Sequence, residues 1–146
     1  MPLLPHKGML AIGAVVDVAL HSREGLVSAR DLAERLHLPR RYLEHVLQAL
    51  VREGILLGAR GANGGYKLAQ ARHAITAYDV FQAVKTVEPE KRSEEFPGLL
   101  GAVIVPALAQ AEQCFASTLK RLSVEDLVRS ATLQILAGYT ADAKPG

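Results

Sequence analysis

The sequence of 146 residues predicts a mainly α-helical fold with one small β-hairpin. Two observations support this fold class. Apolar residues recur at three- and four-residue steps in several segments, a spacing typical of amphipathic helices. Residues 55–69 (ILLGARGANGGYKLA) differ, because two runs of strand-forming residues surround a cluster of glycines. The length fits one ordinary domain with an appended element, which can bury a real core.

The first two helices follow from spacing and capping. Residues 7–20 carry apolar side chains at helical spacing, and the stretch EGL after them ends the first helix. In VSARDLAERL, Ser28 is followed three residues later by Asp31, so each side chain can accept a hydrogen bond from the other's backbone N–H. This capping-box pattern predicts a second helix from about Ala29 to near His37.

A third helix is expected directly after a short turn. Pro39 suits its first turn, where the missing N–H needs no partner, and Gly54 ends it. Its apolar stripe comprises Leu43, Val46, Leu47 and Leu50. Its outer face carries hydrogen-bonding side chains, namely Arg40, Arg41, Tyr42, Glu44, His45, Gln48 and Arg52. Two short helices joined by a turn, with polar side chains on the second, form the helix-turn-helix arrangement that reads duplex DNA.

The glycine-rich hairpin then predicts a wing beside these helices. Asn63-Gly64 is the favoured pair for a tight turn with positive φ, so the flanking runs ILLGA and YKLA are expected to pair as strands. Arg60 at the bend can approach the minor groove, whose potential attracts a guanidinium. Two alternatives remain: a hairpin that only covers the core, and a loop that holds a nucleotide phosphate. The phosphate loop is disfavoured because its glycines would lead into a helix, whereas these lead into a strand.

Together these segments resemble the Rrf-two family of bacterial winged-helix transcription factors, over residues 3 to about 128. The resemblance rests on HKGMLAIGAVVDVALHS in the first helix, VSARDLAERLHLPRRYLEHVLQALVREGIL in the reading unit, ARGANGGYKLA in the wing and ITAYDVFQAVKTVE in a fourth helix. It implies a homodimer that binds double-stranded DNA, with Tyr-Leu-Glu at residues 42–44 and the glycines around Arg60 matching the family's recognition helix and wing. The candidate DNA-contact residues are Ser28, Arg40, Arg41, Tyr42, Glu44, His45, Gln48, Arg60, Gly61, Asn63, Gly64 and Gly65.

Several of these residues have a second interpretation. Tyr42 can pack against the second helix rather than meet DNA. Glu44 can accept a hydrogen bond from cytosine N4, or it can pair with Gln48 one turn later or with Arg40 and Arg41. Those two arginines stand where relatives usually carry small polar residues, so they can contact phosphate, read purines or be solvated, and the operator sequence stays open. Ser28 and the first amides of its helix can hold a phosphate or serve only as a cap.

The C-terminal half is expected to supply dimerisation through a long helix. Apolar residues recur at helical spacing along residues 103–122, and the family resemblance favours a second copy over intramolecular packing as their partner. Pro106 is tolerable only in a first turn, so the regular helix starts near Val105. SVED at residues 123–126 repeats the capping-box pattern and begins another helix that reaches about Ala137. The expected dimerisation residues are Val103, Ile104, Leu108, Ala111, Phe115, Leu119 and Leu122.

The domain division that follows has three parts: a DNA-binding domain of residues 1–88, a linker of residues 89–102 and a dimerisation region of residues 103–140. The distribution of charge agrees with the assignment of residues 1–88 to DNA binding. The net charge is only +2, but residues 36–72 hold six basic and two acidic residues, whereas residues 73–146 hold seven basic and nine acidic ones. A basic segment of this kind suits a polyanion such as DNA.

Many members of the resembled family sense iron, nitric oxide or redox state through an iron–sulfur cluster held by three cysteines between the fourth helix and the dimer helix. Here residues 87–105 contain neither Cys nor His, so we expect no cluster, no metal and no other cofactor. In their place FPGLLGAVIV is expected to pack down as an apolar plug or to line a pocket for a small-molecule effector. Cys114, the one cysteine, is either a small buried hydrophobe or a redox switch that pairs across the dimer.

Other classes of protein fit the sequence less well. The longest apolar run, residues 99–109, is interrupted by Gly101 and Pro106 and is too short to cross a bilayer. With no apolar leader at the start and a single cysteine, a cytoplasmic protein is expected. No Ser-His-Asp order, paired carboxylates or metal cluster indicates an enzyme. The expected function is a dimeric, sequence-specific regulator of transcription, a repressor at a pseudo-palindromic operator, and the alternative is a winged-helix module that binds a protein partner.

Overall fold

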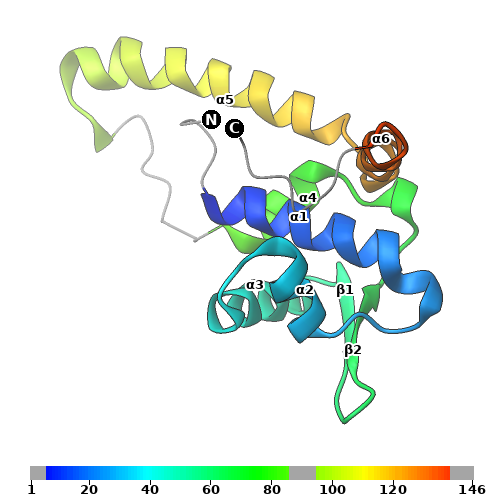
Figure 1. Cartoon of the computed structure of the whole chain (residues 1–146). Coiled ribbons are helices and arrows are strands. Elements are labelled where there is room, and N and C mark those ends of the chain that lie inside the picture. The colour runs from blue at the N-terminus through cyan, green and yellow to red at the C-terminus, as the bar shows by residue number, and fades with distance from the viewer. Residues whose placement is uncertain (1–5, 86–94, 139–146) are drawn as a thin grey trace.

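The structure is a computed structural model that describes residues 6–85 and 95–138 (Figure 1). It is mainly α-helical with one antiparallel hairpin, which confirms the predicted fold class. The helices and strands in chain order are α1 (His6–His21), α2 (Ala29–Leu36), α3 (Arg40–Arg52), β1 (Leu56–Ala59), β2 (Gly65–Leu68), α4 (Ala77–Val84), α5 (Val105–Lys120) and α6 (Val124–Leu136). Among the described residues, no helix has both the length and the apolar character needed to cross a membrane.

The predicted domain limits fall partly in undescribed stretches. The boundary at residue 88, residues 89–94 of the predicted linker and residues 139–140 of the predicted dimerisation region lie outside the described residues. The division into three parts therefore stays a prediction.

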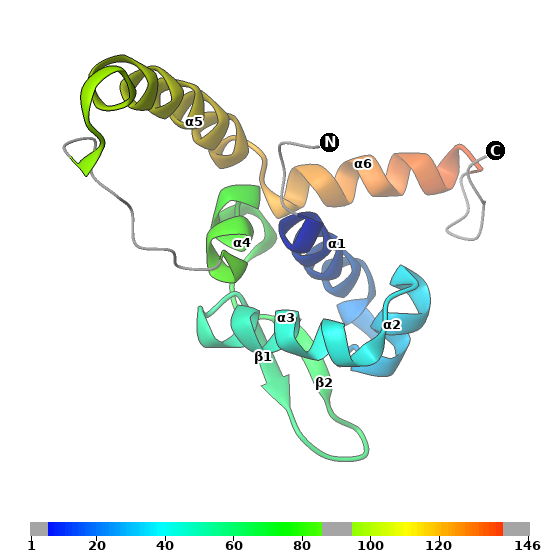
Figure 2. The same ribbon diagram turned by 90° about the vertical axis from the view of Figure 1, so that its left-hand side faces the viewer.

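Helix α1 lies at the centre of the molecule, in contact with α2, α3, α4 and α6 (Figure 2). Small side chains on α1 let these helices approach closely, and Ala11, Ala14 and Val18 are fully buried. A Cβ on Gly8 would lie 2.6 Å from Cδ2 of Phe81 on α4, so a larger residue would displace that ring. The predicted apolar stripe of α3 is buried in the same core, which confirms that prediction.

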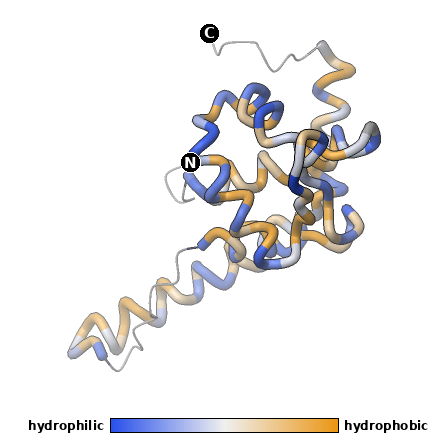
Figure 3. The backbone as a smooth tube through the Cα atoms, turned by 90° about the horizontal axis from the view of Figure 1, so that it is seen from below, coloured by the Kyte–Doolittle hydropathy of each residue, from blue (hydrophilic) through white to orange (hydrophobic). Residues whose placement is uncertain are grey.

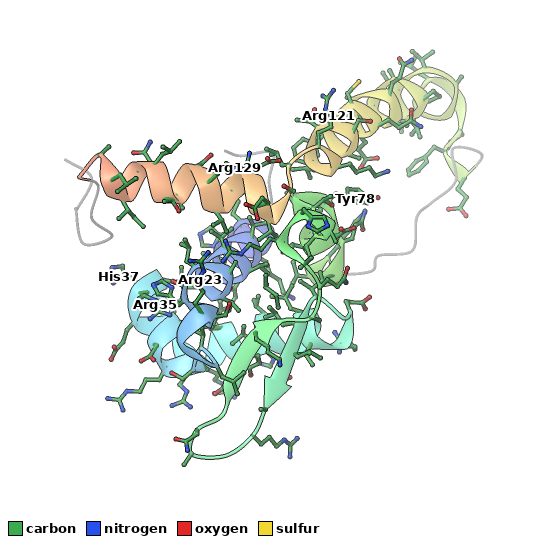
Figure 4. All side chains as sticks on the ribbon, turned by 90° about the vertical axis from the view of Figure 1, so that its right-hand side faces the viewer. Arg23, Arg35, His37, Tyr78, Arg121 and Arg129 are labelled. Atoms are coloured by element: carbon green, nitrogen blue, oxygen red, sulfur yellow. The ribbon has the colours of Figure 1, made fainter. Side chains whose placement is uncertain are left out.

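One ion pair joins α1 to α2. Nε and Nη2 of Arg35 donate to the carboxylate of Asp17 over distances of 2.7 to 3.1 Å, and Asp17 is only 8% exposed. The hydrogen bonds that Arg35 donates to Asp17 raise the pKa of Arg35 above its ordinary value. Figure 4 shows Arg35 on α2, on the side of the molecule away from α5. The pair therefore fixes α2, and with it the turn that follows, to the central helix.

Helices α4 and α6 begin side by side at a shared backbone bridge. Ala77 N donates to Leu122 O, and Val124 N donates to Ile75 O, both over 2.7 Å. Each helix starts with a complete capping box, and the box begun by Ser123 confirms the prediction made from SVED. Val124 is buried, and α6 packs against α1. The last helix therefore shares the core of the N-terminal helices.

Helix α5 projects away from this body (Figures 1 and 2). It begins at Val105, the start that Pro106 predicted, after a short π-helical turn. Phe115 packs edge-to-face on Phe81 of α4, with ring centroids 6.4 Å apart. Leu119 is buried within its own chain. Its side chain thus has an intramolecular partner, and the role of Leu119 in dimerisation stays a prediction.

Two predictions about the C-terminal half are wrong. FPGLLGAVIV is not a plug, because Leu99, Leu100 and Val103 are 70%, 50% and 53% exposed. The segment leads into the projecting end of α5, far from the core that a plug would cover (Figure 1). Cys114 is exposed on α5 and is not a buried hydrophobe. Figure 3 shows that hydrophobic residues recur along this projecting helix.

Candidate nucleic-acid interface

The turn between α2 and α3 is built from local caps. Ser28 Oγ accepts a hydrogen bond from Asp31 N over 3.1 Å, which caps α2. The return bond of the predicted capping box is not among the hydrogen bonds of residues 6–85, and Asp31 is exposed. His37 adopts the left-handed conformation (φ 53°) that commonly ends a helix. Pro39 then precedes α3, and its carbonyl accepts a hydrogen bond from Leu43 N.

Helix α3 turns a polar face outward. Its apolar stripe is buried, while Arg41, His45 and Gln48 are exposed. Nε of Arg40 lies 3.4 Å from Oε1 of Glu44, an exposed ion pair spanning one helical turn. Two arginines lie in the first turn of α3, where the helix dipole is also positive. An anion bound beside them would therefore be stabilising. The face therefore suits a polyanion that also offers hydrogen-bonding groups.

The base of the wing is fixed to the start of α2. Strands β1 and β2 pair antiparallel, with Ala59 opposite Gly65. Val27 N donates to Tyr66 O over 2.9 Å, and Tyr66 N donates to Val27 O over 2.8 Å. A Cβ on Gly65 would lie 2.5 Å from Val27 O, so glycine is needed where the two backbones meet. The wing and the helix-turn-helix unit are thus held in one orientation.

The tip of the wing differs from the predicted turn. The loop between the strands has five residues, from Arg60 to Gly64, and Gly64 N donates to Gly61 O over 3.0 Å. Positive φ occurs at Gly61 (113°) and not at Asn63 or Gly64. The prediction of a tight turn with positive φ at Asn63-Gly64 is therefore wrong. Gly64 is required for another reason, because a Cβ there would collide with the carbonyl oxygen of Ala59.

The wing, the start of α3 and the start of α2 surround one open groove of about 630 Å³. Its walls include Ser28, the cap of α2, together with Arg30 of α2, Arg40 of α3 and Arg60 of the wing. A second groove of about 380 Å³ lies between the wing and the later turns of α3, and includes Gln48 and Arg60. Figures 1 and 2 show α3 and the wing together on the side of the molecule opposite α5. Helix and wing are therefore placed to meet adjacent parts of one extended ligand.

Comparison with known proteins identifies the family. The Rrf2 family, described as "Iron-dependent Transcriptional regulator", matches residues 4–130. The chain belongs to the Rrf2 family. The HTH-type transcriptional regulator IscR of Xenorhabdus nematophila is 33% identical to it over 130 residues, which cover 87% of this chain and 79% of that protein. IscR of Erwinia tasmaniensis is 42% identical over 81 residues, which cover 56% of this chain and 49% of that protein.

Solved structures agree with this assignment. T. potens IscR superposes on the Rrf2 chain with a TM-score of 0.73 and 26% identity, over 98% of this chain and 93% of that one. The oxidized form of Staphylococcus aureus CymR shares the fold, with a TM-score of 0.68 and 23% identity over 86% of this chain and 94% of that one. This Rrf2 protein is therefore a DNA-binding transcriptional regulator with a winged helix, and not an enzyme.

The iron dependence in the family's description does not fit the residues of this Rrf2 chain. An iron–sulfur cluster is held by several thiolates, or by thiolates together with imidazoles. The chain has one cysteine, Cys114, which is exposed on α5, and residues 87–105 contain neither Cys nor His. Within residues 6–85 and 95–138, no three His, Cys, Asp or Glu side chains gather as a metal site. These residues therefore offer no ligand set for an iron–sulfur cluster.

The structure brings some of the predicted DNA-contact residues together. Six line the larger groove, namely Ser28, Arg40, Arg60, Gly61, Gly64 and Gly65. The others are exposed along α3 or at the wing tip, namely Arg41, Tyr42, Glu44, His45, Gln48 and Asn63. Gly65 is buried, so its contact with Val27 explains it without DNA. Arg30 was not predicted although it lines the larger groove, and its place two residues after the Ser28 cap could have indicated it.

Proposed function

We propose that this Rrf2 protein is a homodimeric repressor that binds a pseudo-palindromic operator, with one α3 and one wing in each half-site. The observation that carries the proposal is the groove of about 630 Å³ that joins the cap of α2, the first residue of α3 and Arg60 of the wing. A helix fits the major groove, while a thin ribbon brings a guanidinium to the adjacent minor groove. Half-sites then lie about one or more helical turns apart, because each α3 must meet the same face of the duplex.

The charged residues of α3 divide the contacts between phosphate and bases. Arg40 faces the larger groove beside Ser28, so it contacts phosphate together with the first amides of α2. Glu44 pairs with Arg40 in the free protein, and an acid on a face that meets phosphate is costly unless it accepts a hydrogen bond. The N4 amine of cytosine is the donor that bases offer to such a carboxylate. Arg41 and Gln48 extend the same exposed face and read neighbouring base edges.

Dimerisation is assigned to the outward face of α5 and to the π-helical turn before it (Leu100–Ile104). Val103, Ile104 and Leu108 are 53%, 39% and 64% exposed, although they are apolar. The exposed side of α5 also forms an apolar groove of about 460 Å³ that includes Leu108 and Ala111. Contiguous exposed apolar surface of this kind usually marks an interface. A second copy of the chain is the proposed partner, with residues 103–140 as the dimerisation region.

A second candidate function, thiol-based regulation, is favoured by the exposure of Cys114 on α5. Two such thiols across a dimer axis form a disulfide when an oxidant removes two electrons and two protons are released. Treatment with diamide, followed by electrophoresis without reductant, tests this function. A covalent dimer that is absent from Cys114→Ser supports it, and monomers alone count against it.

The proposed DNA binding is tested by sequencing genomic fragments that the purified protein retains and then titrating a retained fragment at several salt concentrations. Phosphate contacts make the affinity fall steeply with salt. Arg60→Ala is expected to weaken binding by about 1–3 kcal/mol and to lower the salt slope by about one. Arg129→Ala on α6, an exposed arginine far from the wing, is the matched control. An Arg60→Ala titration identical to that of the control would show that the wing does not touch DNA.

Repression is tested separately by transcription in vitro from a retained fragment. The dimer is expected to lower the yield of transcript. A higher yield would contradict repression while leaving DNA binding in place.

A further inference from the structure

A cleft between α4 and α5 lies apart from the DNA interface. It has a volume of about 260 Å³, slightly below the roughly 300–1,000 Å³ of pockets for drug-sized ligands. Its apolar wall comes from Phe81 of α4 and from Phe115 and Leu119 of α5. Ala109 and Ala116 line the same cleft, and their small side chains leave the space open. Figure 4 shows Tyr78, another lining residue, where α4 approaches α5. The cleft therefore suits a small molecule with one apolar part.

The rim of the cleft carries two opposite charges. Lys85 follows the last turn of α4, and Glu112 lies on α5. Among residues 6–85 and 95–138, neither side chain has an ion pair or hydrogen-bond partner. Lys120 is engaged differently, because its Nζ lies 4.6 Å from the centroid of the Tyr78 ring. Two glutamine amides complete the rim with further donors and acceptors. Within the described part of the chain, the cleft thus offers one free cation and one free anion beside an aromatic wall.

We propose that this cleft binds a free α-amino acid with an apolar side chain, which acts as the effector of the regulator. The α-carboxylate pairs with Lys85, the α-ammonium pairs with Glu112, and the side chain packs on the Phe81–Phe115 wall. A ligand with only one of the two charges leaves the other rim residue unmatched. Charge-assisted hydrogen bonds are the stronger kind, so both charges contribute to recognition.

The position of the cleft explains how its ligand acts on DNA binding. Helix α4 packs against α3, the proposed recognition helix, and against α5, the proposed dimer helix. An amino acid between α4 and α5 sets the separation of these two helices, and through the dimer it sets the spacing of the two α3 helices. This regulatory step rests on the proposed dimeric DNA binding, whereas the binding of the amino acid does not.

Isothermal titration of the full chain tests the site, with L-phenylalanine and L-leucine as probes. We expect saturable binding of one molecule per chain. Binding of 2-phenylethylamine, which lacks the carboxylate, and of 3-phenylpropionate, which lacks the ammonium, is expected to be about tenfold weaker or more. Lys85→Gln and Glu112→Gln each weaken L-phenylalanine by a similar factor, while Glu125→Gln on α6 leaves it unchanged. Absence of saturable binding of both amino acids, or equal binding of the two analogues, overturns the proposal.

Electrophoretic mobility of a retained DNA fragment, with and without L-phenylalanine, tests the effector role. The amino acid is expected to change the DNA affinity of the wild type and not that of Lys85→Gln. Binding of the amino acid without any change in DNA affinity overturns the effector role. Failure to retain any DNA instead overturns the proposed function, and the calorimetric result still decides whether the cleft is a binding site.

Discussion

Removal of Arg35 is expected to destabilise the fold more than its place near the surface suggests. Arg35→Ala deletes the hydrogen bonds that Nε and Nη2 donate to Asp17 and leaves that carboxylate on α1 with 8% of the residue exposed. Breaking a fully buried ion pair costs about 3–5 kcal/mol, because the remaining charge has no partner. The Arg35 side chain is itself 33% exposed, so water can compensate in part, and Nδ1 of His21 remains 3.4 Å from Oδ1 of Asp17. We expect a loss of about 2–3 kcal/mol in the free energy of unfolding.

Urea unfolding followed by circular dichroism measures this loss, and the melting temperature should fall by roughly 5–10 °C. Arg30→Ala is the matched control, because Arg30 lies on the same helix and its pair with Glu34 is long (4.0 Å) and exposed. The control should change stability by less than about 0.5 kcal/mol. Adding Asp17→Asn to Arg35→Ala should recover part of the loss, since it removes the stranded charge. Equal effects of Arg35→Ala and Arg30→Ala would refute the assignment of a buried carboxylate at this site.

Three other perturbations test separate parts of the structure. Gly65→Ala should weaken operator binding in a gel-shift titration, because the added Cβ meets the Val27 carbonyl at 2.5 Å; unchanged binding would contradict the fixed wing base. The hydrogen bonds from Ser123 lower the pKa of Asp126, so the charged form stabilises the fold above the ordinary pKa of aspartate and this contribution disappears as pH falls through the lowered pKa. Asp126→Asn should therefore flatten the acid side of a stability profile, and a profile parallel to the wild type would argue against the cap. Leu108→Asp should give monomers in sedimentation velocity, and a persistent dimer would place the interface elsewhere.

The sequence predicted those features that depend on neighbours along the chain. The start of α5 at Val105 followed from Pro106, and the start of α6 followed from the Ser123 cap, because both signals act within one helical turn. The buried stripe of α3 followed from helical spacing in the same way. Local signals also located the wing, because two short apolar runs around a glycine cluster favour a hairpin, and these runs pair as β1 and β2.

Local signals did not suffice where contacts between distant segments decide the outcome. Helical spacing placed Leu119 and Phe115 on one apolar stripe, but it could not say that α4 would cover the end of that stripe. The loop at the wing tip follows from the strand register, which pairs Ala59 with Gly65 and leaves five residues between them, and no turn propensity contains that register. Cys114 lies on the side of α5 that α4 does not cover. It is therefore exposed, although a cysteine is often buried as a small hydrophobic residue.

Helix α4 connects the winged helix-turn-helix unit to the projecting helix α5. It packs against α1, α3 and α5, and its first residue is bridged to the segment that begins α6. The direction in which α5 projects is therefore fixed by contacts such as Phe81 with Phe115, and not by the wing or by α3 itself. In a dimer joined through α5, a small rotation of α5 relative to α4 would produce a larger displacement at the far end of this 16-residue helix. The distance between the two recognition helices would change accordingly. Under the proposed dimeric binding, the spacing of the half-sites is open to control from a site that touches no DNA. A single half-site should then be bound equally well whatever the state of the α4–α5 contact.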